Sequence, residues 1–295
     1  MRICLATCRI YPDLQSSDVL YARALQSLGC EVIVLPWNAV PLSAFSGHDA
    51  IVIRATWDYQ DDMPGYVRWL AGIEQLGVPV FNAPELIRWN NDKRCLLDLA
   101  AKDVAIPRTA PLAHIDVLPA AFDAIGAGRG VLKPCWGGGG IGVELVTRDN
   151  AASTLQRLYD STGGRDYMLQ EFLPEIANGE LSFIFIAGRH AHTVLKRPAP
   201  DEFRVNGRYN PLPVIPHMAS SHLIAQAGVA LQAAGGDPLY ARIDGVVRDG
   251  GLICTEIEVN EPTLYMDVVP ETAELFARET LQRLARLASQ STTRQ

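Results

Sequence analysis

The sequence predicts a mixed α/β and α+β protein made of three consecutive blocks, residues 1–85, 86–168 and 169–295. Three observations lead to this prediction. Strand-like runs alternate with helical periods in the first block, a glycine-rich segment joins two strand-like runs in the second, and acidic residues recur at every second position of a strand in the third. A chain of 295 residues that is 48% hydrophobic and 20% charged is typical of a globular protein with a well-filled core.

The first block has the element order of a parallel sheet with crossing helices. We predict strands at 2–8, 31–35, 50–54 and 78–81, and helices at 17–28 and 65–76. Ligands of such sheets bind beyond the carboxyl ends of the strands. Arg54 and Asp58 lie at one such end, and we interpret them as contacts for a small polar substrate. The alternative is a surface ion pair.

The second and third blocks mix helices with shorter strands. In the second block we predict helices at 86–102, 120–125 and 151–159, a strand ending at Lys133 and a return strand at 143–146. In the third block we predict strands at 167–173, 181–186, 192–196, 240–247 and 252–259, and helices at 223–233 and 270–287. A long ordered loop spans 198–217, and such loops in compact domains are usually functional.

A lysine and a run of glycines mark the second block. Lys133 ends an apolar run, and five glycines follow it: Gly137, Gly138, Gly139, Gly140 and Gly142. Bare backbone amides beside a lysine suit a polyphosphate, because the chain can approach the anion closely. The dinucleotide fingerprint opens a helix, whereas a short β-branched run follows here, and no P-loop motif occurs. The pattern favours a flap over a nucleotide, with an ordinary glycine hairpin as the alternative.

Oxygen-bearing side chains recur along one predicted strand of the third block. Glu256, Glu258 and Asn260 occupy every second position, so they share one face of the strand. Asp244 lies on the preceding strand, and a hairpin brings it alongside. Three or four oxygen ligands on one face predict a Mg²⁺ site next to a nucleotide. The alternative is an exposed strand face that carries charges.

Charge and composition exclude several classes of protein. The net charge is −7 and no basic tract occurs, so nucleic acid is not an expected partner. No apolar stretch approaches the length of a membrane span, and the first residues lack the pattern of a signal peptide, so we expect a cytoplasmic protein without membrane contact. Six scattered cysteines form no C-x-x-C pair, which predicts core thiols and neither a zinc site nor disulfides.

The order of these motifs resembles the ATP-grasp superfamily. The resemblance rests on Lys93, Lys133 with the glycine loop, the segment 170–173, and Asp244 with Glu256-x-Glu258. Within that superfamily the chain is similar to glutathione-synthetase and RimK-type ligases. The resemblance implies an ATP-grasp fold in which 1–85 is a Rossmann-like pre-grasp domain and 86–168 and 169–295 are the two subdomains that clamp the nucleotide. It also implies ATP and Mg²⁺ as cofactors and a homodimer.

The resemblance implies a role for each motif. Lys93, Lys133 and the loop of Gly138, Gly139 and Gly140 contact the phosphates and the base. The segment of Gln170, Glu171, Phe172 and Leu173 reads the adenine edge through its backbone, and Glu175 or Glu180 accepts from the ribose hydroxyls. Asp244, Glu256 and Glu258 hold two magnesium ions. Because the family often has asparagine as the last metal ligand, either Glu258 or Asn260 takes that place.

The implied activity is ATP-dependent ligation of a carboxylate to an amine through an acyl phosphate, with release of ADP and phosphate. Phosphoryl transfer depends on positioning and charge neutralisation. Lys196, Arg204 and Arg242 are therefore candidates to face the transferring phosphate, and Arg197 to hold the substrate. The expected substrate is an amino acid or a small derivative, and a ring-closing ligase of the D-cycloserine-forming, antibiotic-biosynthesis kind is one option. The alternatives are a RimK-like enzyme that extends a protein tail, which the acidic chain disfavours, a silent nucleotide-binding module, and a dinucleotide oxidoreductase.

Overall fold

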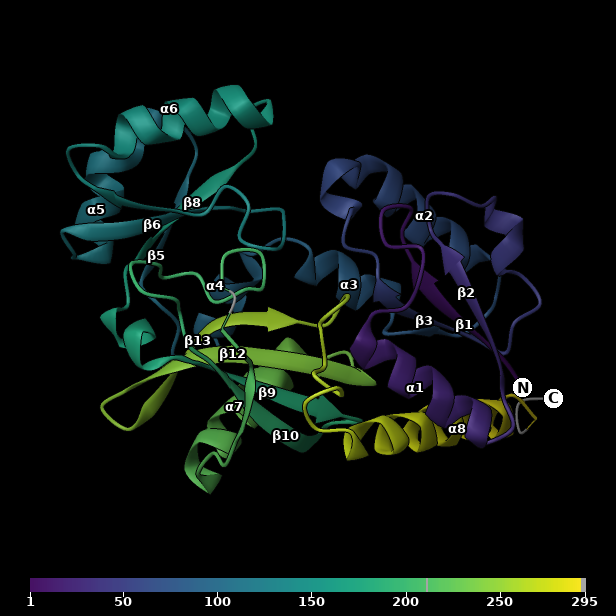
Figure 1. Cartoon of the computed structure of the whole chain (residues 1–295). Helices are drawn as coiled ribbons and strands as arrows, with labels where there is room; N and C mark the ends of the chain where they lie inside the picture. Colours follow the sequence, from purple (N-terminus) through teal and green to yellow (C-terminus); the bar gives the residue numbers. More distant parts are fainter. Residues whose placement is uncertain (211, 293–295) are drawn as a thin grey trace.

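The computed structural model describes residues 1–210 and 212–292 as three sheets with helices packed against them (Figure 1). The first sheet is parallel and has the order β2-β1-β3-β4. Its strands are β1 (Arg2–Thr7), β2 (Glu31–Pro36), β3 (Ala50–Ala55) and β4 (Val80–Phe81). Helices α1 (Ser16–Ser27) and α8 (Glu271–Thr292) bury one face, and α2 (Met63–Gln75) buries the other. The predicted parallel sheet is confirmed.

The second sheet is antiparallel, with the order β5-β8-β6-β7. Its strands are β5 (Thr109–Leu112), β6 (Arg129–Pro134), β7 (Glu144–Thr147) and β8 (Tyr167–Glu171). Helices α5 (Leu118–Ile125) and α6 (Ala151–Thr162) pack on it around Phe122 and Leu155, which form a core separate from that of the first sheet. The glycine loop joins β6 to β7, so the predicted strand–loop–strand arrangement is confirmed and the dinucleotide fingerprint is excluded.

The third sheet is antiparallel and lies beside the other two (Figure 1). Its order is β11-β10-β9-β12-β13, with β9 (Glu180–Ile186), β10 (Arg189–Lys196), β11 (Ile215–His217), β12 (Tyr240–Arg248) and β13 (Gly251–Glu258). One face packs against α3 (Pro84–Asn90), α4 (Cys95–Ala100) and α7 (Ser221–Ala234). The other face shares a core with the first sheet and with α8.

The structure differs from the sequence prediction at one block boundary and at one helix. The predicted boundary at 168 falls inside β8, because that strand pairs with β5 and β6 of the second sheet. The predicted helix at 86–102 is two helices, α3 and α4. The break follows Asn90, whose side chain bonds the backbone of Ile257 in β13 (2.7 Å) and of Val259 just after it (2.9 Å). Both helices therefore pack on the third sheet. Among the described residues, no helix is long and apolar enough to cross a membrane.

Candidate active site

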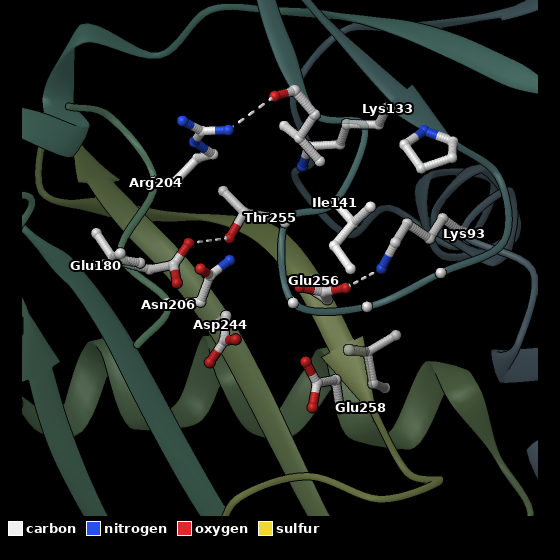
Figure 2. Close-up of a pocket in the computed structure, with 18 of the residues that line it drawn as sticks. Lys93, Lys133, Ile141, Glu180, Arg204, Asn206, Asp244, Thr255, Glu256 and Glu258 are labelled. Carbon is white, nitrogen blue, oxygen red and sulfur yellow. Dashed lines mark hydrogen bonds and ion pairs between the residues drawn. The ribbon is translucent and has the colours of Figure 1, made fainter. Parts of the chain in front are cut away.

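A cavity of about 600 Å³ lies between the second and third sheets. Strands β6 and β8 line one side, β12 and β13 line the other, and the glycine loop and the segment 203–208 close over it. The first block contributes Tyr11, Trp57 and Gln60 to one end. Figure 2 shows Lys93 and Lys133 on one side of this space and the carboxylates of the third sheet on the other. The topology therefore brings the separate sequence motifs into one site.

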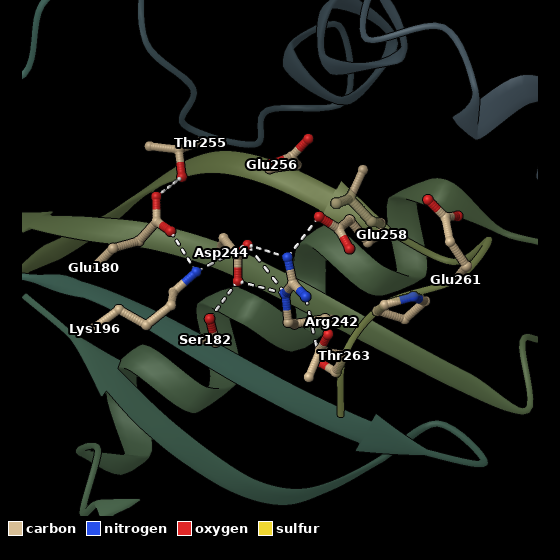
Figure 3. Close-up of polar contacts among 12 residues, drawn as sticks. Glu180, Ser182, Lys196, Arg242, Asp244, Thr255, Glu256, Glu258, Glu261 and Thr263 are labelled. Atoms are coloured by element: carbon tan, nitrogen blue, oxygen red, sulfur yellow. Dashed lines mark hydrogen bonds and ion pairs between the residues drawn. The ribbon is translucent and has the colours of Figure 1, made fainter. Parts of the chain in front are cut away.

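Three carboxylates gather on the floor of the cavity. Asp244 on β12 is the register partner of Glu256 on β13, and one oxygen from each of Asp244, Glu256 and Glu258 lies within 4.8 Å of the others. The alternation of β13 places Glu256 and Glu258 on the same face, as predicted. Arg242 donates to Asp244 (2.9 Å) and to Glu258 (2.5 Å). The predicted metal ligands are thus neighbours (Figure 3).

The charge balance of this cluster suits a cation. Burial alone would raise the pKa of Asp244, but Arg242 and Lys196 lower it to about 2. Burial raises the pKa of Glu258 to about 7; Arg242 opposes the shift, and the charge of Glu256 adds to it. The crowding of like charges therefore adds to the cost of ionising Glu258, and a cation between these carboxylates would relieve it. Carboxylate oxygens grouped in this way fit a hard divalent ion such as Mg²⁺.

Asn260 lines the same cavity, but its amide is already bonded. The Oδ1 atom accepts from the hydroxyl of Tyr66 (2.7 Å), and Nδ2 donates to Asn91 (3.0 Å). Glu258 lies beside the other two carboxylates, whereas both polar atoms of the Asn260 side chain are already hydrogen-bonded. This arrangement favours Glu258 over Asn260 as the last metal ligand.

Two lysines face the carboxylates from the opposite side. Lys93 forms an ion pair with Glu256. Burial opposes the charge of Lys93, but Glu256 outweighs it and raises the pKa of Lys93. Lys133, at the end of β6, has no hydrogen-bond or ion-pair partner among the described residues, and burial lowers its pKa. A half-buried, unpaired ammonium next to a glycine loop fits a phosphate oxygen.

The glycine loop is held from both sides. The amide of Gly138 donates to Oε1 of Gln60 (2.8 Å), which lies in the short 3₁₀ turn η2 (Tyr59–Asp61) of the first block. From the third block, Arg204 reaches the carbonyl of Val143 (3.5 Å; Figure 2). A Cβ atom on Gly140 would lie 2.5 Å from the Asn206 amide nitrogen, so only glycine leaves this approach open. The loop therefore lies in a closed position over the cavity.

The end of β8 forms part of the cavity wall. Gln170, Glu171, Phe172 and Leu173 all line the cavity. The Glu171 amide already donates to the carbonyl of Arg108 (2.9 Å), and its carboxylate is bound by Arg108 (2.7 Å). The side chain of Glu171 is therefore structural, and base reading by this segment would use other backbone groups.

The structure separates the two ribose candidates. Glu175 lies outside the cavity lining, and Arg248 holds its carboxylate at 2.6 Å. Glu180 lines the cavity and is bonded to Lys196 (2.7 Å) and Thr255 (2.9 Å; Figure 3). Of the two alternatives, only Glu180 lines the cavity.

The three candidate catalytic cations all line the cavity. Lys196 lies between Glu180 and Asp244, and Arg242 lies between Asp244 and Glu258. Arg204 pairs with Glu202 (2.7 Å), and its guanidinium carbon stands 3.5 Å from the centre of the Tyr209 ring. These contacts hold Lys196 and Arg242 within the carboxylate floor and Arg204 beside the glycine loop.

The three predicted substrate contacts lie elsewhere, and these predictions are corrected. Arg54 is 1% exposed and forms an ion pair with Asp18 (2.8 Å) beneath the first sheet. Asp58 is buried and accepts from the indole of Trp37 (2.7 Å). Arg197 is exposed and lines a second cavity together with residues 198–203. Arg54 and Asp58 each have a buried partner that the strand pattern alone does not reveal.

Several lining residues escaped the sequence analysis. Gln60, Asn206 and Glu261 line the cavity, and Tyr209 packs against Arg204 at its edge. Gln60 lies in the short turn η2 and the other three in irregular segments, where no periodicity assigns a direction to a side chain. The unusual length of the 198–217 loop was the one available signal, and it pointed to Asn206 and Tyr209 only as part of a segment. All six cysteines are free and buried, as predicted.

Two family profiles together match most of the chain. The profile described as the ATP-grasp domain of prokaryotic glutathione synthetase matches residues 106–271, which is more than half of the chain. The profile described as the N-terminal domain of D-cycloserine synthetase DcsG matches residues 3–82.

Individual relatives agree with this assignment. Glutathione synthetase from Bordetella parapertussis is 27% identical over 247 residues, which cover 81% of this chain and 74% of the relative. Cycloserine biosynthesis protein DcsG from Streptomyces lavendulae is 25% identical over 284 residues, which cover 89% and 92%.

Solved structures show the same fold. The crystal structure of D-cycloserine synthetase DcsG matches with a TM-score of 0.85 at 23% identity and covers 96% of this chain and 100% of that one. A RimK domain ATP-grasp protein from Sphaerobacter thermophilus matches with a TM-score of 0.71 at 18% identity, over 95% of this chain and 99% of that one. With the glycine loop, the lysines and the carboxylate floor in one cavity, these matches show that the chain belongs to the ATP-grasp ligases of the prokaryotic glutathione-synthetase type.

Proposed function

We propose that this protein activates a substrate carboxylate with ATP and joins it to an amine. One observation carries the proposal: an unpaired lysine, Lys133, faces a cluster of three carboxylates beneath a closed glycine loop. A cation on one side and a divalent-metal site on the other are what a bound triphosphate requires.

Each group of residues has a role in this proposal. Lys93, Lys133 and the amides of the glycine loop would bind the phosphates, the end of β8 would contact the adenine, and Glu180 would accept from the ribose. Asp244, Glu256 and Glu258 would hold Mg²⁺, which neutralises phosphate charge when it is bound. Lys196, Arg204 and Arg242 would neutralise the remaining charge around the transferring group.

The proposed reaction has two steps. A carboxylate oxygen of the substrate attacks the γ-phosphorus of ATP, the bond to the β-phosphate oxygen breaks, and ADP leaves. The amine then attacks the acyl carbon, and inorganic phosphate departs with the former carboxylate oxygen while the amine loses a proton. The side chains of the cavity position the groups and supply charge, so no covalent nucleophile of the protein is needed.

We further propose that the amine belongs to the same molecule as the carboxylate, so that ligation closes a ring. The likeness to DcsG supports this refinement, because it extends through the first block, which supplies Tyr11 and Trp57 to the substrate end of the cavity. The product would then be lighter than the substrate by one water, and ADP release would need no second amine.

Isotope transfer tests the reaction class. Candidate amino acids and derivatives labelled with ¹⁸O in the carboxylate are incubated with ATP and Mg²⁺, and ADP, phosphate and product masses are measured. The expected result is ¹⁸O in the released phosphate and a C–N bonded product. ADP release without label transfer would contradict the acyl-phosphate route.

A matched pair of variants links the activity to the cavity. Glu256→Gln removes one carboxylate of the floor, and Glu144→Gln alters a β7 carboxylate that pairs with Arg157 (2.6 Å) outside the cavity. We expect ADP release to fall about 10²-fold or more in the first variant, by analogy with the loss of other preorganised electrostatic groups. The Glu144 variant should retain wild-type turnover, and an equal loss in both would refute the proposed site.

A further inference from the structure

The turn that follows β13 is clamped by the first block. The indole of Trp57 donates to the carbonyl of Glu261 (3.0 Å), and Arg54 donates to the next carbonyl, that of Pro262 (2.7 Å). Tyr66 donates to the side chain of Asn260 (2.7 Å). Three consecutive residues are thus fixed by three side chains of the first block, from β3, α2 and the segment between them. Such support is typical of a position whose side chain must be held in one place.

The side chain that this clamp presents is an unpaired carboxylate. Glu261 lines the cavity, is half-buried, and has no side-chain hydrogen bond or ion pair to another of the described residues. It does not belong to the group formed by Asp244, Glu256 and Glu258. Figure 3 shows it beyond Glu258, at the opposite end of the row from Glu180, with no contact drawn to it. A fixed carboxylate without a partner in a ligand cavity calls for a cationic ligand group.

The surroundings of Glu261 suit an organic cation. Trp57 and Tyr11 line the same end of the cavity, and their rings meet edge to face with centroids 5.2 Å apart. Aromatic faces attract ammonium groups as well as apolar carbon atoms. Arg242 on the floor is already bonded to Asp244 and Glu258, and Lys93 is paired with Glu256. Neither of these cations forms an ion pair with Glu261 among the described residues.

We propose that Glu261 binds the ammonium group of the substrate, next to the carboxylate that is activated. This inference rests on the proposed function, because it places the substrate carboxylate at the metal side and the ammonium group toward Trp57. A carboxylate partner keeps an amine protonated, and a protonated amine is not a nucleophile. The group at Glu261 is therefore a spectator that orients the substrate. The substrate class is an amino acid with a free α-amino group, and a different nitrogen makes the new bond.

The test compares amino acids with analogues that lack the amine. ADP release is measured with D- and L-amino acids that carry a second, side-chain nitrogen, such as 2,4-diaminobutyrate, ornithine and O-aminoserine, and with the matching 2-hydroxy acids and Nα-acetyl compounds. Wild-type protein should prefer the free amino acid by about 10- to 150-fold in kcat/KM, the range expected for a hydrogen bond to a charged group. Glu261→Gln, which keeps the shape and removes the charge, should reduce this preference to a few-fold through KM, with the KM for ATP unchanged.

Asp61 offers a matched control. It is a second carboxylate that lines the cavity without a side-chain partner among the described residues, but it is exposed. Asp61→Asn should keep the preference for the free amino acid. Glu261→Asp keeps the charge on a shorter side chain, so its preference should lie between those of Glu261→Gln and wild type. If Glu261→Gln does not fold, the preference of Glu261→Asp is compared with wild type instead. This inference alone is overturned if Glu261→Gln keeps the wild-type preference in kcat/KM, or if Asp61→Asn loses as much of the preference as Glu261→Gln does. ADP release with none of the compounds overturns the proposed function, and this inference falls with it.

Discussion

Three adjacent glycines allow closure of the loop to be tested one atom at a time. A Cβ on Gly138 meets nothing within 4 Å, and the φ angle there is not in the left-handed region. A Cβ on Gly139 also meets nothing, but its φ is +61°. A Cβ on Gly140, at φ +71°, lies 2.5 Å from Asn206 Nδ2 and 3.1 Å from Tyr209 Cε2. Alanine at Gly138 therefore adds no strain, alanine at Gly139 adds backbone strain alone, and alanine at Gly140 adds backbone strain together with steric overlap.

The expected effects follow from these differences. Left-handed backbone at alanine costs about 1–2 kcal/mol, so Gly139→Ala should raise the KM for ATP about 5- to 30-fold by disfavouring the closed loop. Overpacking adds about 1–3 kcal/mol, so Gly140→Ala should raise it at least about 30-fold. Gly138→Ala should stay within about 2-fold of wild type, as surface changes usually do. ADP release at varied ATP concentration measures all three.

A double variant checks the steric part of this reasoning. Asn206→Ala removes the atom nearest the added Cβ, so Gly140→Ala combined with it should return to the range of Gly139→Ala. Equal KM values for ATP in all three single variants would refute the closed loop as the conformation that binds the nucleotide. A larger effect at Gly138 than at Gly140 would refute the packing against the 203–210 segment.

Three further variants separate binding groups from groups that hold the fold. Lys133→Met should lower ADP release about 10²-fold or more, and it should not lower the urea midpoint, because burial already lowers the pKa of Lys133. Lys102→Met, which alters an exposed lysine, should change neither ADP release nor the urea midpoint. Arg54→Met leaves the buried carboxylate of Asp18 unpaired and should reduce the free energy of unfolding by about 3–5 kcal/mol, which urea denaturation measures; a midpoint equal to wild type would contradict the buried ion pair. Burial lowers the pKa of His192 to about 4 from 6.5, so the unfolded chain binds the proton first and about 3 kcal/mol of stability is lost as the pH falls through that interval. In His192→Asn the difference between the urea midpoints at pH 7 and pH 4.5 should therefore shrink, and an unchanged difference would exclude this histidine as the cause.

The sequence predicted the parts of the site that depend on local repeats. Glu256 and Glu258 share a face because a strand has a period of two, and the hairpin to Asp244 needs only neighbouring strands. The glycine loop was equally local, since it connects β6 to β7. These elements carry their geometry in adjacent residues, so their outcome could be predicted.

Contacts between distant segments could not be predicted in the same way. Arg54 lies at a strand end, as the analysis required, but its direction is set by Asp18 on α1 and by the Pro262 carbonyl 208 positions away. Glu261 is fixed by Trp57, which lies 204 positions away. Periodicity gives the face of the strand on which a residue lies. It does not identify the residue that packs against that face, because the partner comes from another part of the chain.

The last helix gives the order of synthesis a structural meaning. Phe276 of α8 stacks on Tyr21 of α1, with ring centroids 3.9 Å apart, and both belong to a core that also holds Ile3 of β1 and Ile184 of β9. During translation the opening strands must wait for the closing residues before that apolar face is covered. The middle sheet, with its separate core, can settle earlier. In a ribosome-bound chain that stops before residue 271, the second sheet should therefore be folded, while the first and third sheets still lack the helix that completes their shared core.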